Sequence, residues 1–132
     1  AIRNVVARYP PGGRQTSAEF EEVKAEIRSK LYALNAIQSA RKAGNNKDFK
    51  SALMLVNKAI TAINNEHSFW RAKAELLVAT GQPREAVQAA IKARNLNPSD
   101  PISELLISYC YDALGDIRNA NVARNRARRL IR

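Results

Sequence analysis

The sequence predicts an all-α fold in which antiparallel helix pairs stack as a repeat array. Small residues recur at a spacing of 34, and three separate series share that spacing. A common period of this length is the signature of a helical repeat protein. No segment alternates apolar and polar residues as a half-buried strand does. The three series are Ala52, Ala86 and Ala120; Ala59, Ala93 and Ala127; and Ala40, Ala74 and Ser108.

Residues 1–16 are expected to be a linker or the end of an upstream domain. Two prolines and two glycines between Tyr9 and Gln15 disfavour a continuous helix there. Because the chain starts at Ala1 and not at methionine, we expect it to be a piece of a longer protein. Thr16 and Glu19 then match a capping box, in which each side chain bonds a backbone amide near the other. This motif predicts the start of a helix.

A long helix is predicted over residues 17–43, with a bend near residues 30–33, because no glycine or proline follows until Gly44. Apolar residues at three- and four-residue spacing form one stripe along it. We expect residues 17–32 to act as a capping helix that covers the apolar edge of the first repeat. The stripe consists of Phe20, Val23, Ile27, Leu31 and Leu34.

The rest of the chain alternates predicted helices and turns. Gly44 suits the left-handed backbone position beyond a helix end, and Gly81 and Gly115 end later helices. Pro83 suits the first turn of a helix, and Asp116 can cap the last helix. The predicted helices cover residues 48–64, 67–80, 83–96, 101–114 and 117–131.

The segment from Trp70 to Pro98 resembles a tetratricopeptide repeat. The resemblance implies a right-handed superhelical array over residues 17–132, with three repeats at about 33–66, 67–100 and 101–132. The chain departs from the family pattern where Leu77 replaces the usual tyrosine, where Glu104 replaces the opening aromatic residue of the third repeat, and where Lys47 replaces the turn glycine of the first. The third repeat also lacks the closing proline. The residues that carry the resemblance are Trp70, Ala74, Gly81, Ala86, Ala93 and Pro98.

The resemblance also implies a binding surface, because the first helix of each pair lines the concave side of such arrays. The predicted function is a protein-interaction scaffold that holds a peptide or a partner protein in this groove. The predicted groove residues are Leu34, Ile37, Arg41, Ser68, Arg71, Glu75, Val78, Ile102, Leu105, Tyr109 and Asp112.

Chaperone-binding members of the family grip a C-terminal carboxylate with Lys, Asn and Arg side chains on the first helices. Only one of the five matching positions in this chain is cationic, so we do not expect a carboxylate clamp of that type. The five positions are Ile37, Arg41, Ala72, Ile102 and Leu106.

Two alternatives to peptide binding remain open. The net charge of +10 and six arginines near the C-terminus suit a nucleic-acid partner. However, the charge is spread along the chain and the arginines point in several directions on a helix, which makes this partner the less expected one. Self-association is the second alternative, because the unpaired last helix leaves an apolar edge at Leu130 and Ile131. The six arginines are Arg118, Arg124, Arg126, Arg128, Arg129 and Arg132.

The sequence contains no recognisable catalytic or metal-binding constellation, so we predict no enzyme activity, no metal and no cofactor for this chain. His67 is the only histidine, and we expect it at the surface or at a helix start. Cys110 lies among apolar residues and is expected to be buried as a small hydrophobe. No apolar run approaches the roughly 20 residues that span a bilayer.

A second resemblance involves the first 28 residues. The run TSAEFEEVKAEIR at residues 16–28, with Arg3 and Ala7-Arg8-Tyr9-Pro10 before it, is similar to a junction in BepA-type periplasmic zinc metalloproteases. There the catalytic domain is followed by such a helix and then by tetratricopeptide repeats. Ile27 replaces the usual leucine. The resemblance implies a C-terminal module of such a protease, with the zinc-binding motif upstream of Ala1 and a periplasmic location.

Overall fold

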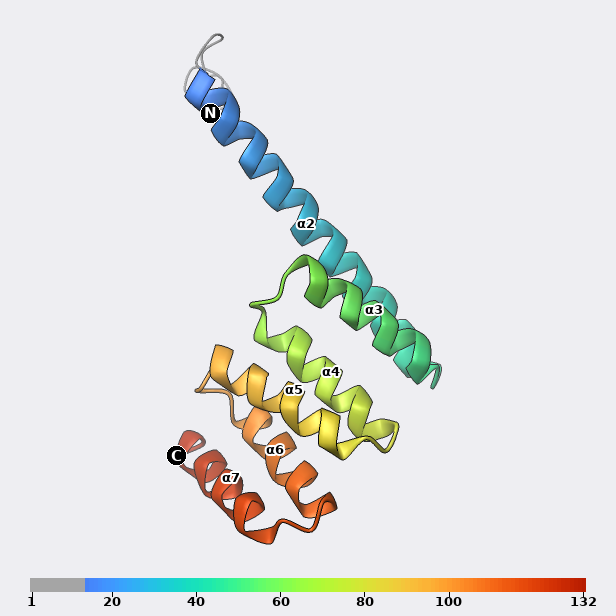
Figure 1. Cartoon of the computed structure of the whole chain (residues 1–132), viewed down its shortest axis with the longest axis vertical. Coiled ribbons are helices and arrows are strands. Elements are labelled where there is room, and N and C mark those ends of the chain that lie inside the picture. The colour runs from blue at the N-terminus through green and yellow to red at the C-terminus, as the bar shows by residue number, and fades with distance from the viewer. Residues whose placement is uncertain (1–13) are drawn as a thin grey trace.

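The computed structural model describes residues 14–132, and the only regular secondary structure in that range is α-helix (Figure 1). This confirms the predicted all-α class. The predicted boundaries of the five later helices agree with the observed ones to within two residues. In chain order the helices are α2 (Arg14–Asn45), α3 (Phe49–Ala62), α4 (His67–Ala79), α5 (Pro83–Leu96), α6 (Pro101–Ala113) and α7 (Ile117–Leu130).

Consecutive helices form the antiparallel pairs α2–α3, α4–α5 and α6–α7, joined by short turns (Figure 1). Neighbouring pairs stack through α3 against α4 and α5 against α6. The starts of α3, α6 and α7 are capped by aspartate side chains, and Asp116 accepts a hydrogen bond from the Asn119 amide at 3.1 Å. The predicted cap at Asp116 is therefore confirmed.

Small residues form the contact layer between paired helices. All nine positions of the 34-residue series are buried, and Ala52, Ala86 and Ala120 are fully inaccessible. Around them lie two apolar clusters, one centred on Val56 and Phe69 and the other on Leu77, Ile107 and Cys110. Small residues therefore recur at this spacing because they lie buried where the two helices of a pair meet.

The turn inside each pair repeats with the same period. Lys47, Gly81 and Gly115 have positive φ values of 62°, 73° and 80°. In each turn the next amide donates to the carbonyl five residues earlier, as from Gln82 to Leu77 at 2.8 Å. Gly44, which we expected in the left-handed position, lies inside α2 instead. That prediction is wrong because the repeat register places the turn at Lys47.

Replacing Lys47 with glycine is expected to raise the free energy of unfolding. A left-handed backbone costs a residue with a Cβ atom about 1–2 kcal/mol, and glycine removes this cost. The greater conformational freedom of glycine in the unfolded chain offsets part of the resulting gain in stability. The expected net gain is about 0.5–1 kcal/mol, measured by urea unfolding. Lys58→Gly on the exposed face of α3 is the control and should lose about 1 kcal/mol. A lower free energy of unfolding for Lys47→Gly would contradict a cost of the left-handed backbone at Lys47.

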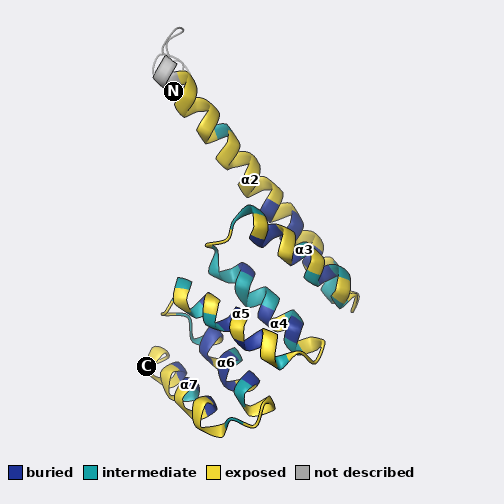
Figure 2. Cartoon of the chain, viewed as in Figure 1, coloured by how far each residue is buried: buried dark blue, intermediate teal, exposed yellow. Residues whose placement is uncertain are grey.

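The capping helix is the main correction to the predicted fold. Residues 17–32 belong to α2, which runs as one helix of 32 residues from Arg14, so Thr16 lies inside the helix and not at its cap. The first part of α2 extends away from the other helices instead of covering them (Figure 1). Its side chains are almost all exposed (Figure 2). The apolar residues in the stripe are aligned as predicted but do not pack on the first repeat, because the buried face of α2 is formed by Ala33, Ala36, Ile37 and Ala40.

Candidate protein-binding groove

A groove of about 510 Å³ lies between the first helices of the first two pairs, α2 and α4. Residues of α2 and α4 form its walls, and Phe49 and Val56 of α3 lie at its base. Of the predicted groove residues, the structure brings together Leu34, Ile37, Arg41, Ser68, Arg71 and Glu75.

Apolar side chains give the groove its floor. Ile37 and Phe69 are buried between the helices and present only their edges. Leu34, by contrast, is 53% exposed at the rim of the groove. A large apolar side chain that remains exposed beside a buried apolar floor is the arrangement expected where an apolar group of a ligand docks.

The charged side chains of the groove differ in how they are held. Arg71 donates to Asp100 Oδ2 at 2.9 Å and lies 3.9 Å from Glu75. Arg41 is exposed and, among the described residues, has no ion pair or hydrogen bond. Arg41 is therefore the cation of the groove that is available to a ligand, whereas Arg71 is largely neutralised by its own neighbours.

The groove continues toward the start of the repeats. A neighbouring hollow of about 830 Å³ shares Leu34, Ser68 and Phe69 with it. On α2 this hollow extends to Glu26 and Lys30, which form an exposed ion pair of 3.4 Å. A ligand longer than one side chain can therefore follow α2 in both directions from Leu34.

The other predicted groove residues lie elsewhere. Val78 packs against the second apolar cluster and is not among the residues that line the groove, so its role in binding stays a prediction. Asp112 is paired with Arg124 of α7. Ile102, Leu105 and Tyr109 form an exposed apolar face on α6, between 45% and 58% accessible, but outside the α2–α4 groove. The role of these three residues in binding stays a prediction.

Sequence reasoning missed several lining residues. Gln38, Leu76 and Ala79 also face the groove, as does Ala72, which the sequence had placed only among the clamp-type positions. They follow the predicted residues at one-turn spacing, as Ala72 and Leu76 follow Ser68. Helical periodicity extended along α2 and α4 is the signal that could have identified them.

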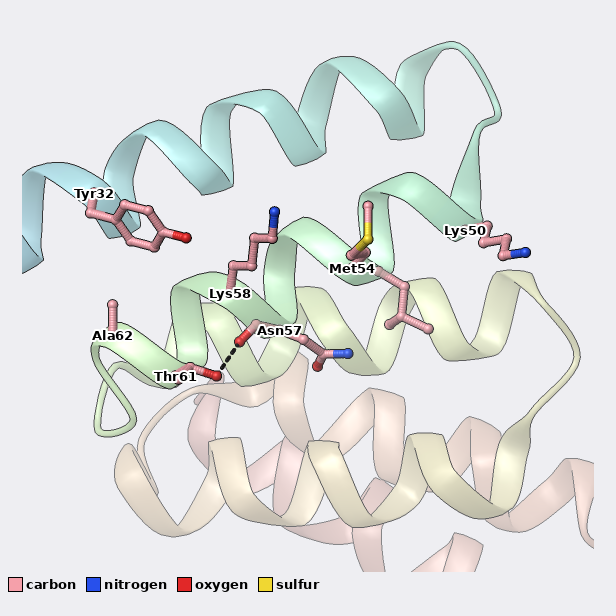
Figure 3. Close-up of a pocket in the computed structure, with 8 residues that line it drawn as sticks. Tyr32, Lys50, Met54, Asn57, Lys58, Thr61 and Ala62 are labelled. Carbon is pink, nitrogen blue, oxygen red and sulfur yellow. Dashed lines mark hydrogen bonds between the residues drawn. The ribbon is translucent and has the colours of Figure 1, made fainter.

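A separate hollow, of about 640 Å³, lies on the outer face of α3 (Figure 3). Met54, Asn57 and Lys58 line it together with Tyr32 of α2, and the Thr61 hydroxyl donates to the Asn57 carbonyl at 2.9 Å. Its lining residues are mostly exposed side chains of a single helix. The α2–α4 groove, with a buried floor from three helices, is the better candidate for a specific site.

The C-terminal arginines do not form one face. Arg124 pairs with Asp112, and Arg128 donates to Asn125 at 3.5 Å. Arg126 and Arg129 line a separate hollow of about 410 Å³ with Arg94 and Glu104. Four of the six arginines are thus divided between one hollow and two separate contacts, and nucleic-acid binding stays the less expected alternative.

Glu104 occupies a buried position. It stands 34 residues after Trp70, is only 2% exposed, and its Oε1 lies 4.0 Å from Arg94 Nε. Its Oε2 has no hydrogen-bond partner among the described residues.

The remaining candidates for chemistry are structural. His67 begins α4, where its Nε2 lies 3.3 Å from Asn97 Nδ2, and Glu66 caps the helix. Cys110 is fully buried, and burial raises the pKa of its thiol, which disfavours a reactive thiolate. Within residues 14–132, no cluster of three potential metal ligands occurs. No helix in the described range is long and apolar enough to cross a membrane.

Neither a protein-family model nor a curated relative matches the sequence. Solved structures do match in three dimensions. The first tetratricopeptide-repeat domain of Spaghetti (RPAP3), bound to the HSP90 peptide SRMEEVD, aligns with a TM-score of 0.74 and 17% identity over 76% of this chain and 79% of its own. The second such domain, bound to the same peptide, has a TM-score of 0.77 and 14% identity over 81% and 98%.

A bacterial protein shows the same likeness. The type III secretion translocator chaperone SycD of Yersinia enterocolitica aligns with a TM-score of 0.72 and 14% identity over 75% of each chain. At such low identity these matches establish the fold and not the function. The helix pairs, the buried 34-residue series and these alignments together show that the chain has the fold of a tetratricopeptide-repeat domain.

Proposed function

We propose that the chain is a protein-interaction scaffold that binds a peptide segment of a partner protein in the α2–α4 groove. The observation that carries the proposal is the exposed Leu34 at the rim of a buried apolar floor, with the available Arg41 close by in the same groove. An apolar anchor and one charge are the features by which such grooves select short segments. The peptide complexes of the structural neighbours support this use of the fold.

The chemistry of the groove defines the ligand we propose. An apolar side chain would cover Leu34 and Leu76, and a carboxylate on the same segment would pair with Arg41. Recognition of a C-terminal carboxylate by a clamp is not part of the proposal. At the positions that match the clamp of chaperone-binding members, Ile37, Ala72 and Ile102 are apolar.

Selection from a phage-displayed library of short random peptides tests the proposal. The full chain serves as bait, and affinities of the recovered peptides are measured by fluorescence anisotropy. We expect peptides that combine an apolar and an acidic residue. The double variant Leu34→Asp and Arg41→Glu should weaken their binding by about tenfold or more, because it removes the apolar rim and reverses the charge.

A matched control uses the outer hollow on α3. Met54→Asp and Lys58→Glu make the same kinds of substitution at exposed positions outside the groove, and we expect unchanged affinity. Circular dichroism checks that both variants are folded. The proposal fails if no peptide is enriched, if the groove variant binds as tightly as the wild type, or if only the control variant loses affinity.

For the setting of this scaffold, we propose a non-catalytic module of a larger protein, such as a BepA-type periplasmic zinc metalloprotease. The support is the similarity of residues 16–28 to the helix that joins the two parts of such proteases. Residues 1–13 of the similar stretch lie outside the described part of the structure. The sequence encoded upstream of Ala1 tests the setting: a zinc-binding HExxH motif is expected, and an upstream sequence without one overturns it.

A further inference from the structure

The hollow of about 410 Å³ beside Glu104 is a second candidate site, separate from the α2–α4 groove. It lies where the ends of α5 and α7 meet the first turn of α6. None of the described residues that line it also lines the groove. The residues that surround it are Arg94, Asn95, Pro98, Glu104, Arg126, Arg129 and Leu130.

The repeat spacing shows why a hollow exists at this position. In the second repeat the Trp70 indole donates to the Asn64 carbonyl at 2.8 Å, and the Lys92 ammonium lies 5.9 Å from the ring centre. The residues 34 positions after these three all line the hollow. They are Pro98, Glu104 and Arg126. Because a glutamate side chain is smaller than an indole, the space that the ring fills in one repeat stays open in the next.

Glu104 brings a buried carboxylate to this hollow, with only 3% of its side chain exposed. Its ion pair with Arg94 Nε has a length of 4.0 Å, which is too long for a hydrogen bond. Its Oε2 has no hydrogen-bond partner among the described residues. Since buried polar groups are nearly always hydrogen-bonded, this oxygen indicates that a donor from outside the chain completes the site.

Cations surround the carboxylate. Arg126 and Arg129 lie one turn apart on α7, are exposed, and have no ion pair or hydrogen bond among the described residues. Arg94 lies opposite them on α5 and donates to Asn95 Oδ1 at 3.3 Å through one terminal nitrogen. Three guanidinium groups outnumber one carboxylate in this hollow, so its charge attracts an anion.

The arginines and the carboxylate together define the ligand. Guanidinium groups match the oxygens of a carboxylate, a sulfate or a phosphate, but a bare oxyanion would be repelled by Glu104. Hydrogenphosphate fits both parts, because at neutral pH it has two negative charges and one P–OH donor. Sulfate has the same shape and charge without the proton, and a phosphate monoester loses its last proton at a pKa of about 6.

We propose that this hollow binds inorganic hydrogenphosphate. Arg94, Arg126 and Arg129 donate to its oxygens, and Glu104 Oε2 accepts from its P–OH group. A water molecule takes up roughly 30 Å³ of liquid volume, so the hollow has room for a tetrahedral oxyanion and several waters. The proposal does not depend on peptide binding in the α2–α4 groove.

Isothermal titration calorimetry of the full chain with sodium phosphate tests the site, at pH 8 and at an ionic strength held constant with sodium chloride. We expect saturable binding of one phosphate per chain. Sulfate and methyl phosphate should bind at least about tenfold more weakly, because neither has a proton for Glu104 at this pH. The absence of saturable phosphate binding, or sulfate binding of equal affinity, overturns the proposal.

Glu104→Gln separates the role of the carboxylate from that of the arginines. Glutamine has the same shape, and its amide nitrogen donates to an oxyanion without a proton. We therefore expect this variant to bind sulfate as tightly as phosphate. A variant that keeps the full preference for phosphate contradicts the contact between Oε2 and the P–OH group.

Arg126→Gln with Arg129→Gln should weaken phosphate binding by about tenfold or more, because two charged donors are removed. The matched control is Arg118→Gln with Arg132→Gln, which removes the same charge from exposed positions outside the hollow and should leave the affinity unchanged. Circular dichroism checks that every variant is folded. An equal loss in both double variants assigns the binding to the net charge of the chain and overturns the site.

Discussion

Replacing Ala86 with leucine is expected to lower the free energy of unfolding by about 3 kcal/mol. Ala86 is fully inaccessible and lies in the apolar cluster with Ala74, Leu77 and Cys110. The additional carbon atoms have no space where α4 and α5 meet, so the helices must separate or neighbouring side chains must leave their preferred rotamers. A chain of this size has a net stability of only about 5–15 kcal/mol, so this loss is large.

Urea unfolding followed by circular dichroism measures this effect. Gln88→Leu places the same side chain on the exposed face of the same helix, and we expect a change of no more than about 0.5 kcal/mol. If Ala86→Leu is as stable as the control, close packing over the 34-residue series does not determine the structure. A second series member, Ala120→Leu on α7, should behave like Ala86→Leu because Ala120 is also fully buried.

Asp100→Ala is expected to cost about 2 kcal/mol, the second large effect. The carboxylate of Asp100 caps α6 by accepting from the Ile102 amide at 3.0 Å. It also accepts from Arg71 of α4 at 2.9 Å, and its side chain is only 10% exposed. The substitution therefore removes a helix cap and a part-buried bond between two repeats, and it releases Arg71 toward the groove.

A double-mutant cycle separates these two contributions. If Arg71 and Asp100 interact as the structure shows, the cost of removing both is smaller than the sum of the single losses by about 1 kcal/mol. Asp116→Ala is the control, since Asp116 caps α7 through Asn119 without a link to another repeat; we expect a loss of about 1 kcal/mol. Strict additivity of Arg71→Ala and Asp100→Ala would contradict the coupling.

The sequence was informative where one local feature recurs. The buried alanines mark the face of each helix that packs, the turn glycines mark where a helix ends, and the prolines mark where one starts. The helices after Gly44 could therefore be predicted closely. The first turn was misplaced because Lys47 adopts a left-handed backbone that lysine rarely takes, while Gly44 offered an apparently better signal. The repeat spacing had marked Lys47 as the residue in place of the turn glycine, but residue type alone favoured Gly44 for the left-handed position.

The site was harder to predict because it depends on how helices face one another. The resemblance to tetratricopeptide repeats implied that Leu34, Arg41 and Ser68 lie on the inner faces, and the structure brings them to one groove. Spacing alone could not reveal that Val78 turns toward the core or that Asp100 holds Arg71. The capping role assigned to residues 17–32 failed for a related reason: an apolar stripe shows that a helix has a contact face, but not what covers that face.

The central claim is that the α2–α4 groove binds a peptide segment, and chemical-shift mapping by NMR tests it most directly. The 15N-labelled full chain is titrated with a peptide recovered in the wild-type selection. We predict that the perturbed amides concentrate at Leu34, Arg41, Ser68, Glu75 and Leu76. Perturbations centred on the outer face of α3 or on α7, with these groove amides unchanged, would contradict the claim.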